Sequence, residues 1–193
     1  LSCIFFFILI LLMAYECLTA KEFTQSFERI SFSALCILYC GFGMSFITRI
    51  SFVENSLWFI LFFLSLVVLC DSAAWFFGML FGKNNRGLIK ASPNKSIAGF
   101  LGGIFSDILL AVLAKIYFPD IFTGNYISII ILALLTAFAA IIGDLIESVF
   151  KRSCNIKDSG NIVPGRGGIL DSIDSFIVAG PVFYLGIYFL YLL

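Results

Sequence analysis

The segment YISIIILALLTAFAAIIGDLIESVF (residues 126–150) contains no charged side chain before Asp144. A helix needs about 20 consecutive apolar residues to cross the hydrocarbon core of a bilayer. The segment therefore predicts a transmembrane helix with a polar end.

Five further apolar segments have the same character, namely 1–15, 31–48, 57–81, 97–118 and 172–193. Hydrophobic residues make up 61% of the chain and charged residues 12%, whereas soluble domains carry about 25% charge. A globule of this size could not bury so much apolar surface, so lipid is the expected solvent. We predict an all-α polytopic membrane protein of about six transmembrane helices, which form a single integral membrane domain over residues 1–193.

The first segment is short for a full crossing and lacks the basic residues that begin a secretory signal peptide. It is therefore expected to be a membrane helix, whole or truncated, rather than a cleaved leader. Because the first residue is leucine, the start is expected upstream or at a non-standard start codon. Residues 1–55 read as generic membrane sequence, and residues 56–193 are expected to hold the functional helices and the polar cytoplasmic loops.

Basic residues predict the orientation of these helices. Ten of the 12 Lys and Arg residues lie in or beside the loops after the first, third and fifth spans. The positive-inside rule places that side in the cytoplasm. The two large polar loops, 82–96 and 151–171, then share the cytoplasmic face and can meet there. The formal net charge of zero gives no general attraction to nucleic acid.

Two residue types limit the chemistry. Histidine is absent, which excludes His-based acid–base catalysis, Ser-His-Asp triads and His-ligated zinc. The six cysteines form no CxxC pair. Since most lie in apolar runs, they are expected to be small buried hydrophobic residues rather than disulfides or metal ligands.

Acidic residues gather at the ends of the last two spans. Asp144, Glu147, Ser148 and Lys151 share one helix face, and carboxylates in a membrane usually face a cavity or a partner. The alternative is a Glu147–Lys151 pair on a solvated face. Asp171 and Asp174 could serve as helix caps. Together with Asp144, however, they predict a hard-cation site, with Mg²⁺ favoured because no histidine or clustered cysteine accompanies them.

The polar loops supply groups that suit phosphate. Glycines let backbone N–H groups approach an anion, and basic side chains neutralise it. In the loop 151–171 these residues are Lys151, Arg152, Lys157, Gly160, Gly165, Arg166, Gly167 and Gly168. In the other loop, Ser92-Pro93 is expected to open a helix whose start holds Lys95 and Ser96.

The third span carries Asp71 far from either loop. Close helix packing through small residues accounts for Gly78, and is also expected of Gly99, Gly102 and Gly103. Packing does not account for an aspartate at this depth.

Three blocks of sequence carry a family resemblance. They are DSAAWFFG with FGK (71–78 and 81–83), SPNKSIAGFLGG (92–103), and SVFKR, KDSG and PGRGGILDSID (148–152, 157–160 and 164–174). In this order they resemble the signature of the phosphatidate cytidylyltransferases, also called CDP-diglyceride synthases. The resemblance runs from Asp71 to Asp174.

The resemblance implies an Mg²⁺-dependent nucleotidyltransferase that converts CTP and phosphatidate to CDP-diacylglycerol and pyrophosphate. Its location would be the bacterial plasma membrane, with the site facing the cytoplasm, and a homodimer is implied. Whether K⁺ joins Mg²⁺ stays open. The implied catalytic residues are Asp144, Ser148, Lys151, Asp171 and Asp174, with Asp144, Asp171 and Asp174 as metal ligands. The implied phosphate- or substrate-binding residues are Asp71, Lys95, Ser96, Arg152, Lys157, Asp158, Gly165, Arg166, Gly167 and Gly168.

The chain departs from the family pattern at three positions. The family usually has His at Arg166, Arg at Ser172 and an acidic residue at Ala98. These differences motivate one alternative, a degenerate member without catalysis. The intramembrane aspartates motivate another, a cation-coupled transporter.

Overall fold

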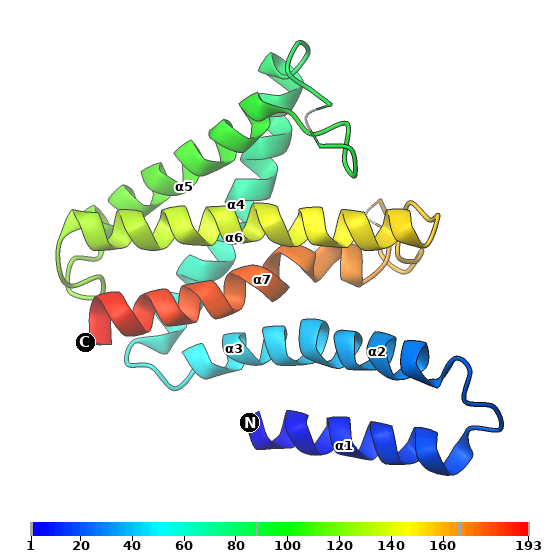
Figure 1. Cartoon of the computed structure of the whole chain (residues 1–193). Helices are drawn as coiled ribbons and strands as arrows, with labels where there is room; N and C mark the ends of the chain where they lie inside the picture. Colours follow the sequence, from blue (N-terminus) through cyan, green and yellow to red (C-terminus); the bar gives the residue numbers. More distant parts are fainter. Residues whose placement is uncertain (1, 88, 166, 193) are drawn as a thin grey trace.

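The structure is a computed structural model that describes residues 2–87, 89–165 and 167–192 (Figure 1). Helices dominate these residues, and none of them lies in a β-strand. The helices are α1 (Ser2–Thr19), α2 (Ser26–Cys36), α3 (Gly43–Ile50), α4 (Ser56–Phe81), α5 (Ile97–Tyr117), α6 (Tyr126–Ser153) and α7 (Leu170–Ile187). π-Helical turns at Ile37–Phe42 and Tyr188–Leu192 join α2 to α3 and extend α7.

Within the described residues, five helices are long and apolar enough to cross a membrane: Ser26–Ile50, Ser56–Phe81, Ile97–Tyr117, Tyr126–Ser153 and Leu170–Tyr191. They match five of the predicted spans. The remaining apolar helix, Cys3–Thr19, is shorter, as expected for the first segment. The all-helical membrane fold is therefore confirmed.

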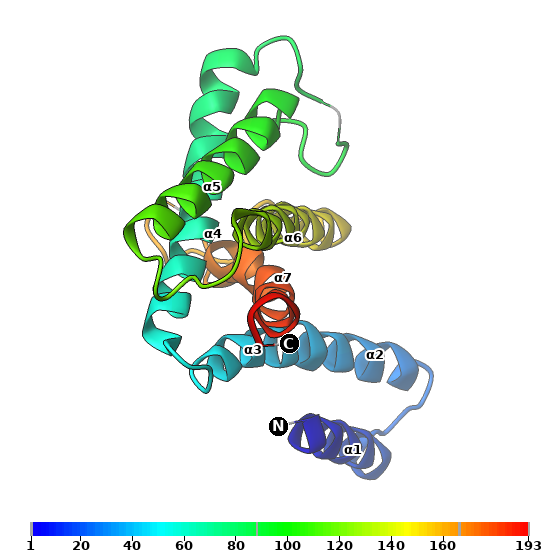
Figure 2. The same cartoon turned by 90° about the vertical axis from the view of Figure 1, so that its left-hand side faces the viewer.

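The helices form two packed groups that share α7. One group also contains α4, α5 and α6, and the other contains α1, α2 and α3. In Figures 1 and 2, α6 and α7 run side by side, while α4 and α5 form a second close pair beside α6. The rod Ser26–Ile50 lies along the opposite side of α7, and α1 packs on that rod. The polar ends of α6 and α7 therefore meet at the loop that joins them.

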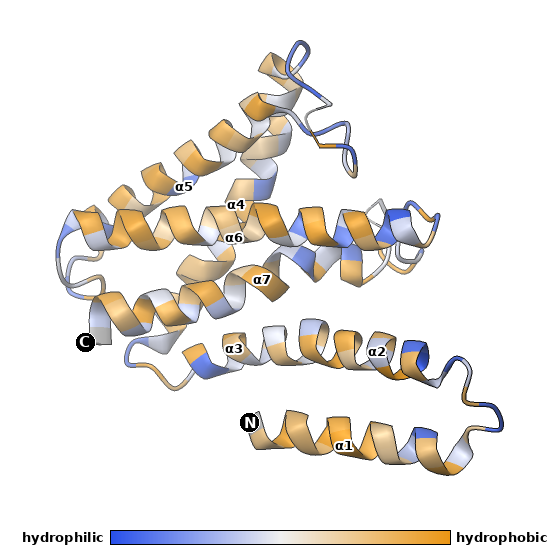
Figure 3. Cartoon of the chain, in the orientation of Figure 1, coloured by the Kyte–Doolittle hydropathy of each residue, from blue (hydrophilic) through white to orange (hydrophobic). Residues whose placement is uncertain are grey.

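Phenylalanine rings fill the core where α4, α7 and the α5–α6 loop converge. Phe63 lies 5.0 Å from Phe183 between ring centroids, and Phe62 lies 4.8 Å from Phe122. Such aromatic contacts contribute about 0.5–1.5 kcal/mol beyond the area they bury. Many other large apolar side chains are exposed, and Figure 3 shows apolar residues along most of each helix with polar residues concentrated in the loops. This surface suits contact with lipid.

Glycines allow α5 to pack directly on α4, as predicted. A Cβ at Gly103 would lie 2.9 Å from the Cys70 carbonyl oxygen, and one at Gly99 would lie 2.6 Å from that of Ala74. A Cβ at Gly102 would meet the Phe77 ring, at 2.5 Å from its Cγ. These close approaches bring the loop before α5 next to α4.

Two expectations about local structure were wrong. The helix after Ser92-Pro93 begins only at Ile97, and its N-cap is Ser96, whose Oγ accepts a hydrogen bond from Gly99 N at 3.1 Å. Ser92 and Pro93 instead lie in the turns that precede the cap.

The cysteines also differ from expectation. All six are free, but only Cys70 is buried, and four are exposed, namely Cys3, Cys17, Cys36 and Cys154. The apolar runs that contain Cys3, Cys17 and Cys36 belong to helices with outward-facing surfaces, so residence in such a run does not imply burial.

Asp107 is a fully buried carboxylate in α5 (0% exposed), and neither of its oxygens has a hydrogen-bond partner among the described residues. Leaving a buried polar group unpaired costs about 1–3 kcal/mol. We expect Asp107→Leu to raise the thermal unfolding temperature of the detergent-solubilised protein. Ser106→Ala, which removes a neighbouring hydroxyl bonded to Gly102 O at 2.9 Å, is the control. A clear destabilisation by Asp107→Leu would contradict this reading.

Candidate active site

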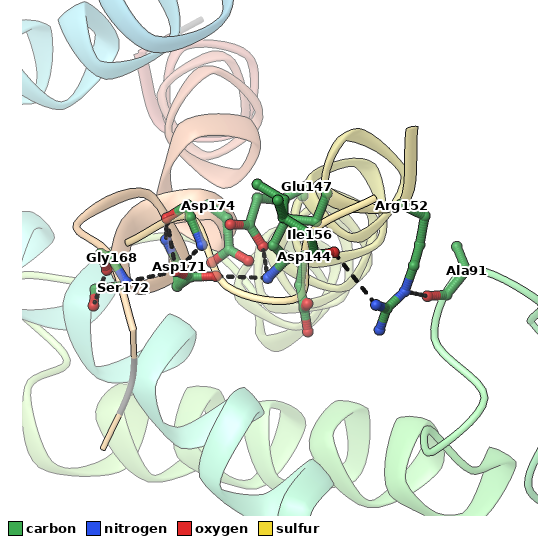
Figure 4. A network of polar contacts seen from close by, with 12 residues as sticks. Ala91, Asp144, Glu147, Arg152, Ile156, Gly168, Asp171, Ser172 and Asp174 are labelled. Atoms are coloured by element: carbon green, nitrogen blue, oxygen red, sulfur yellow. Dashed lines mark hydrogen bonds and ion pairs between the residues drawn. The ribbon is translucent and has the colours of Figure 1, made fainter. Parts of the chain in front are cut away.

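The candidate site forms where the last turns of α6 lie against the first turn of α7 (Figure 4). Gly143 makes the close contact possible, because a Cβ there would lie 2.6 Å from the Asp174 carbonyl oxygen and 3.0 Å from Ser175 Cα. The next residue is Asp144, and Glu147 follows one turn later on the same face. The tight crossing therefore brings the acidic ends of two helices together.

Three carboxylates form an acidic triad, defined here as Asp144, Glu147 and Asp174. One oxygen from each lies within 4.8 Å of the others. Glu147 is fully buried and Asp174 is 7% exposed. Three negative charges at this spacing repel one another unless a cation or protons offset them. An all-oxygen donor set without histidine or cysteine suits Mg²⁺, so the residues present fit a hard divalent cation.

Two lysines border the triad. Lys95 Nζ forms an ion pair with Asp144 Oδ2, and Lys151 Nζ forms one with Glu147 Oε2. Lys95 comes from the loop before α5, so this loop reaches α6. Arg152 Nε also donates to Ala91 O at 3.4 Å (Figure 4). The two polar loops meet, as predicted.

Asp171 lies beside the triad but has other partners. Its Oδ1 accepts from Lys151 Nζ at 2.6 Å. Its Oδ2 accepts from Ser159 N at 2.8 Å, Ser159 Oγ at 2.6 Å and Gly168 N at 2.6 Å. The carboxylate thus holds the α6–α7 loop closed over the first turn of α7. A metal-ligand role for Asp171 stays a prediction.

The loop itself is folded back by paired backbone bonds. Val163 N donates to Gly167 O at 2.8 Å, and Gly167 N donates to Val163 O at 3.0 Å. Gly165 and Gly167 have positive φ angles of 79° and 106°, which glycine adopts without the strain of a side chain. A hollow of about 460 Å³ is lined by Lys157, Asp158, Asn161, Val163, Pro164, Gly165 and Gly167. Four of the predicted substrate- or phosphate-binding residues, Lys157, Asp158, Gly165 and Gly167, therefore line one hollow, which no member of the triad lines.

A larger cavity of about 520 Å³ opens between α4, α5 and α6. Asp144 joins the cavity to the triad, and Trp75 is among its apolar walls. Its polar lining is Asp71, Arg86, Asn94, Lys95, Ser96 and Asp144. Asp71 of α4 therefore lines the same cavity as Lys95 and Ser96, as the sequence predicted.

The other predicted residues fall around this centre. Ser148 is buried (8% exposed) on α6. Arg152 donates to backbone oxygens of Ala91 and Ile156, so its guanidinium ties the two loops together. Arg166 lies outside the described residues. Ser172, at one of the family departures, donates to Gly168 O at 3.3 Å.

Two residues were not assigned to the site from the sequence. Glu147 belongs to the acidic triad, and its spacing of three residues from Asp144 on one helix face was the available signal. Arg86 lines the larger cavity, and only its place in a basic loop pointed to it. For Glu147, the facing carboxylate is Asp174, which comes from another helix.

Comparisons with known proteins show the family of the chain. A sequence profile described as the cytidylyltransferase family matches residues 1–190. The chain belongs to this family. A phosphatidate cytidylyltransferase of Staphylococcus aureus (strain COL) is 37% identical over 172 residues, which cover 89% of this chain and 64% of that protein. Proteins of the same name from Staphylococcus saprophyticus and Staphylococcus epidermidis (strain RP62A) are 37% and 36% identical over the same lengths.

The chain thus spans 64% of the length of these relatives. The match to the family profile extends over residues 1–190 and therefore includes the acidic triad, Lys95, Lys151 and the α6–α7 loop. Acidic and basic groups side by side suit a member of a cytidylyltransferase family, because nucleotides are polyanionic and bind metal ions.

Gly143→Ala is expected to destabilise the protein and to weaken the site together. The added methyl must push α7 away from α6, and overpacking of this kind costs roughly 1–3 kcal/mol. Thermal unfolding in detergent would measure the effect. Gly160→Ala is the control, because its Cβ would meet only Gly168 Cα, at 3.4 Å. Equal unfolding temperatures for the two variants would argue against a tight α6–α7 crossing.

Proposed function

We propose that the protein transfers a cytidylyl group from CTP to phosphatidate, giving CDP-diacylglycerol and pyrophosphate. The observation that carries the proposal is the acidic triad bordered by Lys95 and Lys151 in a membrane chain of the cytidylyltransferase family. The names of the staphylococcal relatives support phosphatidate as the lipid substrate.

The residues suit this reaction because its difficulty is charge. A phosphate oxygen of phosphatidate attacks the α-phosphorus of CTP, and the bond from that phosphorus to the β-phosphate oxygen breaks. The nucleophile is already an anion, so no strong base is required and a chain without histidine can perform the step. Lys95 and Lys151 would lower the repulsion between the two anionic substrates and orient them.

The cation is proposed to be Mg²⁺, held by Asp144, Glu147 and Asp174. A divalent ion there would neutralise charge on the phosphates and stabilise the leaving pyrophosphate. Lys151 forms ion pairs with both Glu147 and Asp171, so one ammonium group connects the triad to the residue that holds the α6–α7 loop closed. Ser148, Ser96 and Lys157 are proposed to contact phosphate oxygens, and a second cation such as K⁺ stays an open question.

The two substrates are proposed to arrive from different phases. The lining of the larger cavity includes polar residues such as Lys95 and Asp144 and apolar residues such as Trp75 and Met79, which suits a lipid with a phosphate head. By the positive-inside rule, the basic loops support a cytoplasmic position for these polar residues, where CTP is available. We further propose a multi-pass location in a bacterial plasma membrane. A homodimer remains a prediction.

The direct test supplies radiolabelled CTP, phosphatidate micelles and Mg²⁺ to the detergent-solubilised protein. Label is expected in the lipid phase, together with one pyrophosphate released per lipid labelled. Omitting phosphatidate should abolish both signals. Label that stays entirely in the aqueous phase, with a correctly folded protein, would overturn the proposal and favour a non-catalytic family member.

One observation favours a second candidate, a cation-coupled transporter. Asp71 and Asp107 both lie within membrane-length helices, and Asp107 is fully buried. Intramembrane carboxylates of this kind commonly relay cations. Ion flux in protein-containing liposomes, without pyrophosphate release, would support the transporter over the transferase.

A further inference from the structure

Tyr39 links the N-terminal membrane rod to the acidic triad. Its ring packs edge-on against Phe150 of α6, with centroids 5.4 Å apart and an interplanar angle of 84°. Its hydroxyl donates a long hydrogen bond of 3.5 Å to the carbonyl oxygen of Gly143. The two contacts lie on either side of the α6 turn that carries Asp144 and Glu147.

The charges of the site also act on this hydroxyl. They come from Asp174, Glu147 and Asp144, all three members of the triad. Tyr39 itself is half-buried, and a phenol is a neutral donor at physiological pH. Its single O–H is donated to Gly143 O, so it acts on the triad through the α6 backbone and leaves the carboxylate oxygens free for a cation.

The backbone around Tyr39 is fixed in an unusual form. Ile37–Phe42 is π-helical, and π-helical turns inside longer helices occur frequently at functional sites. Directly after it, a Cβ at Gly43 would lie 2.8 Å from the Ile177 carbonyl oxygen. The rod is therefore pressed against α7, one turn beyond Asp174, which fixes the distance of Tyr39 from the triad.

We propose that Tyr39 is a positioning residue of the active site, whose ring and hydroxyl hold the Gly143–Glu147 turn of α6 and thereby set the affinity of the acidic triad for a divalent cation. The inference rests on the cation of the proposed function but does not depend on which nucleotide or lipid reacts. It also gives a role in the site to residues 1–55, which the sequence alone marked as generic.

A packing role alone makes a different prediction. The ring contact with Phe150 needs no hydroxyl, so Tyr39→Phe would keep the packing and leave cation affinity unchanged. A positioning role requires the hydroxyl. Loss of an outer contact to a metal site typically lowers affinity by 10–100-fold, and the length of this hydrogen bond places the expected effect near the lower end.

The test measures Mn²⁺ binding to the full detergent-solubilised chain by electron paramagnetic resonance of the free ion, without CTP or lipid. Tyr39→Phe is expected to raise the Mn²⁺ dissociation constant roughly 10-fold. Tyr126→Phe, an exposed tyrosine at the far end of α6, is the matched control and should bind as the unchanged protein does. Asp174→Asn should abolish the binding, which identifies the triad as the site measured.

A dissociation constant for Tyr39→Phe within twofold of the unchanged protein would overturn the role of Tyr39, as would the absence of triad-dependent Mn²⁺ binding. Either result is separate from failure of the proposed function, which is the absence of labelled lipid. As a second readout, the Mg²⁺ concentration for half-maximal transfer should rise in Tyr39→Phe while the KM for phosphatidate stays the same.

Discussion

Asp174→Asn is expected to lower the transfer of label from CTP to lipid by roughly 100- to 1000-fold, the range found when a charged group that stabilises a transition state is removed. Asp174 is 7% exposed and is the only member of the acidic triad from α7. Asparagine keeps the size of the side chain and an oxygen that can accept from Ser175 N, now bonded to Asp174 Oδ1 at 2.7 Å. The fold should therefore survive while the negative charge is lost.

Asp120→Asn serves as the control, because Asp120 is exposed in the loop between α5 and α6, away from the triad. Initial rates should be measured over a range of Mg²⁺ concentrations. If a metal ligand has been lost, part of the activity should return at high Mg²⁺. An activity for Asp174→Asn equal to that of Asp120→Asn would remove Asp174 from the site and leave the triad without its α7 member.

The membrane helices could be predicted closely because their signal is local. Length and apolar composition decide whether a segment can span lipid, and both are readable without knowing the neighbours. The span 126–150 and the helix Tyr126–Ser153 begin at the same residue. The helix cap at Ser96 was placed wrongly because Ser92-Pro93 carries an equally good local signal, and the choice between them depends on packing against α4.

The site was only partly predictable because its contacts cross between distant segments. Asp144 and Asp174 stood out as carboxylates in apolar surroundings, and both belong to the triad. Glu147 was open to two readings, since helical spacing shows which side chains share a face but not what lies opposite. The opposing group is set by the α6–α7 crossing at Gly143, which no local pattern encodes. Tyr39 could not be placed at all from the sequence, because it meets α6 from another helix.

Asp171→Asn separates the two roles open to this residue, metal ligand and loop clasp. The carboxylate accepts from Lys151 through one oxygen and from Ser159 and Gly168 through the other. An amide has one oxygen, so whichever way it turns, its NH₂ group meets a donor. We expect the α6–α7 loop to open and transfer to fall roughly 10- to 100-fold, since misplaced catalytic groups cost about that much.

If Asp171 acts as the clasp, its loss should leave the triad able to bind Mn²⁺ with an affinity close to that of the unchanged protein, while limited proteolysis of the loop becomes faster. Ser159→Ala provides the matched variant, because it removes only the two bonds that the hydroxyl makes with Asp171 (Oγ to Oδ2 at 2.6 Å, and Asp171 N to Oγ at 3.3 Å) and leaves the carboxylate intact. It should show the same two changes in weaker form. A tenfold or greater loss of Mn²⁺ affinity in Asp171→Asn, absent from Ser159→Ala, would instead make Asp171 a metal ligand. The cation site would then extend from the triad to the first turn of α7, and Lys151 would be shared between two ligands of the same ion.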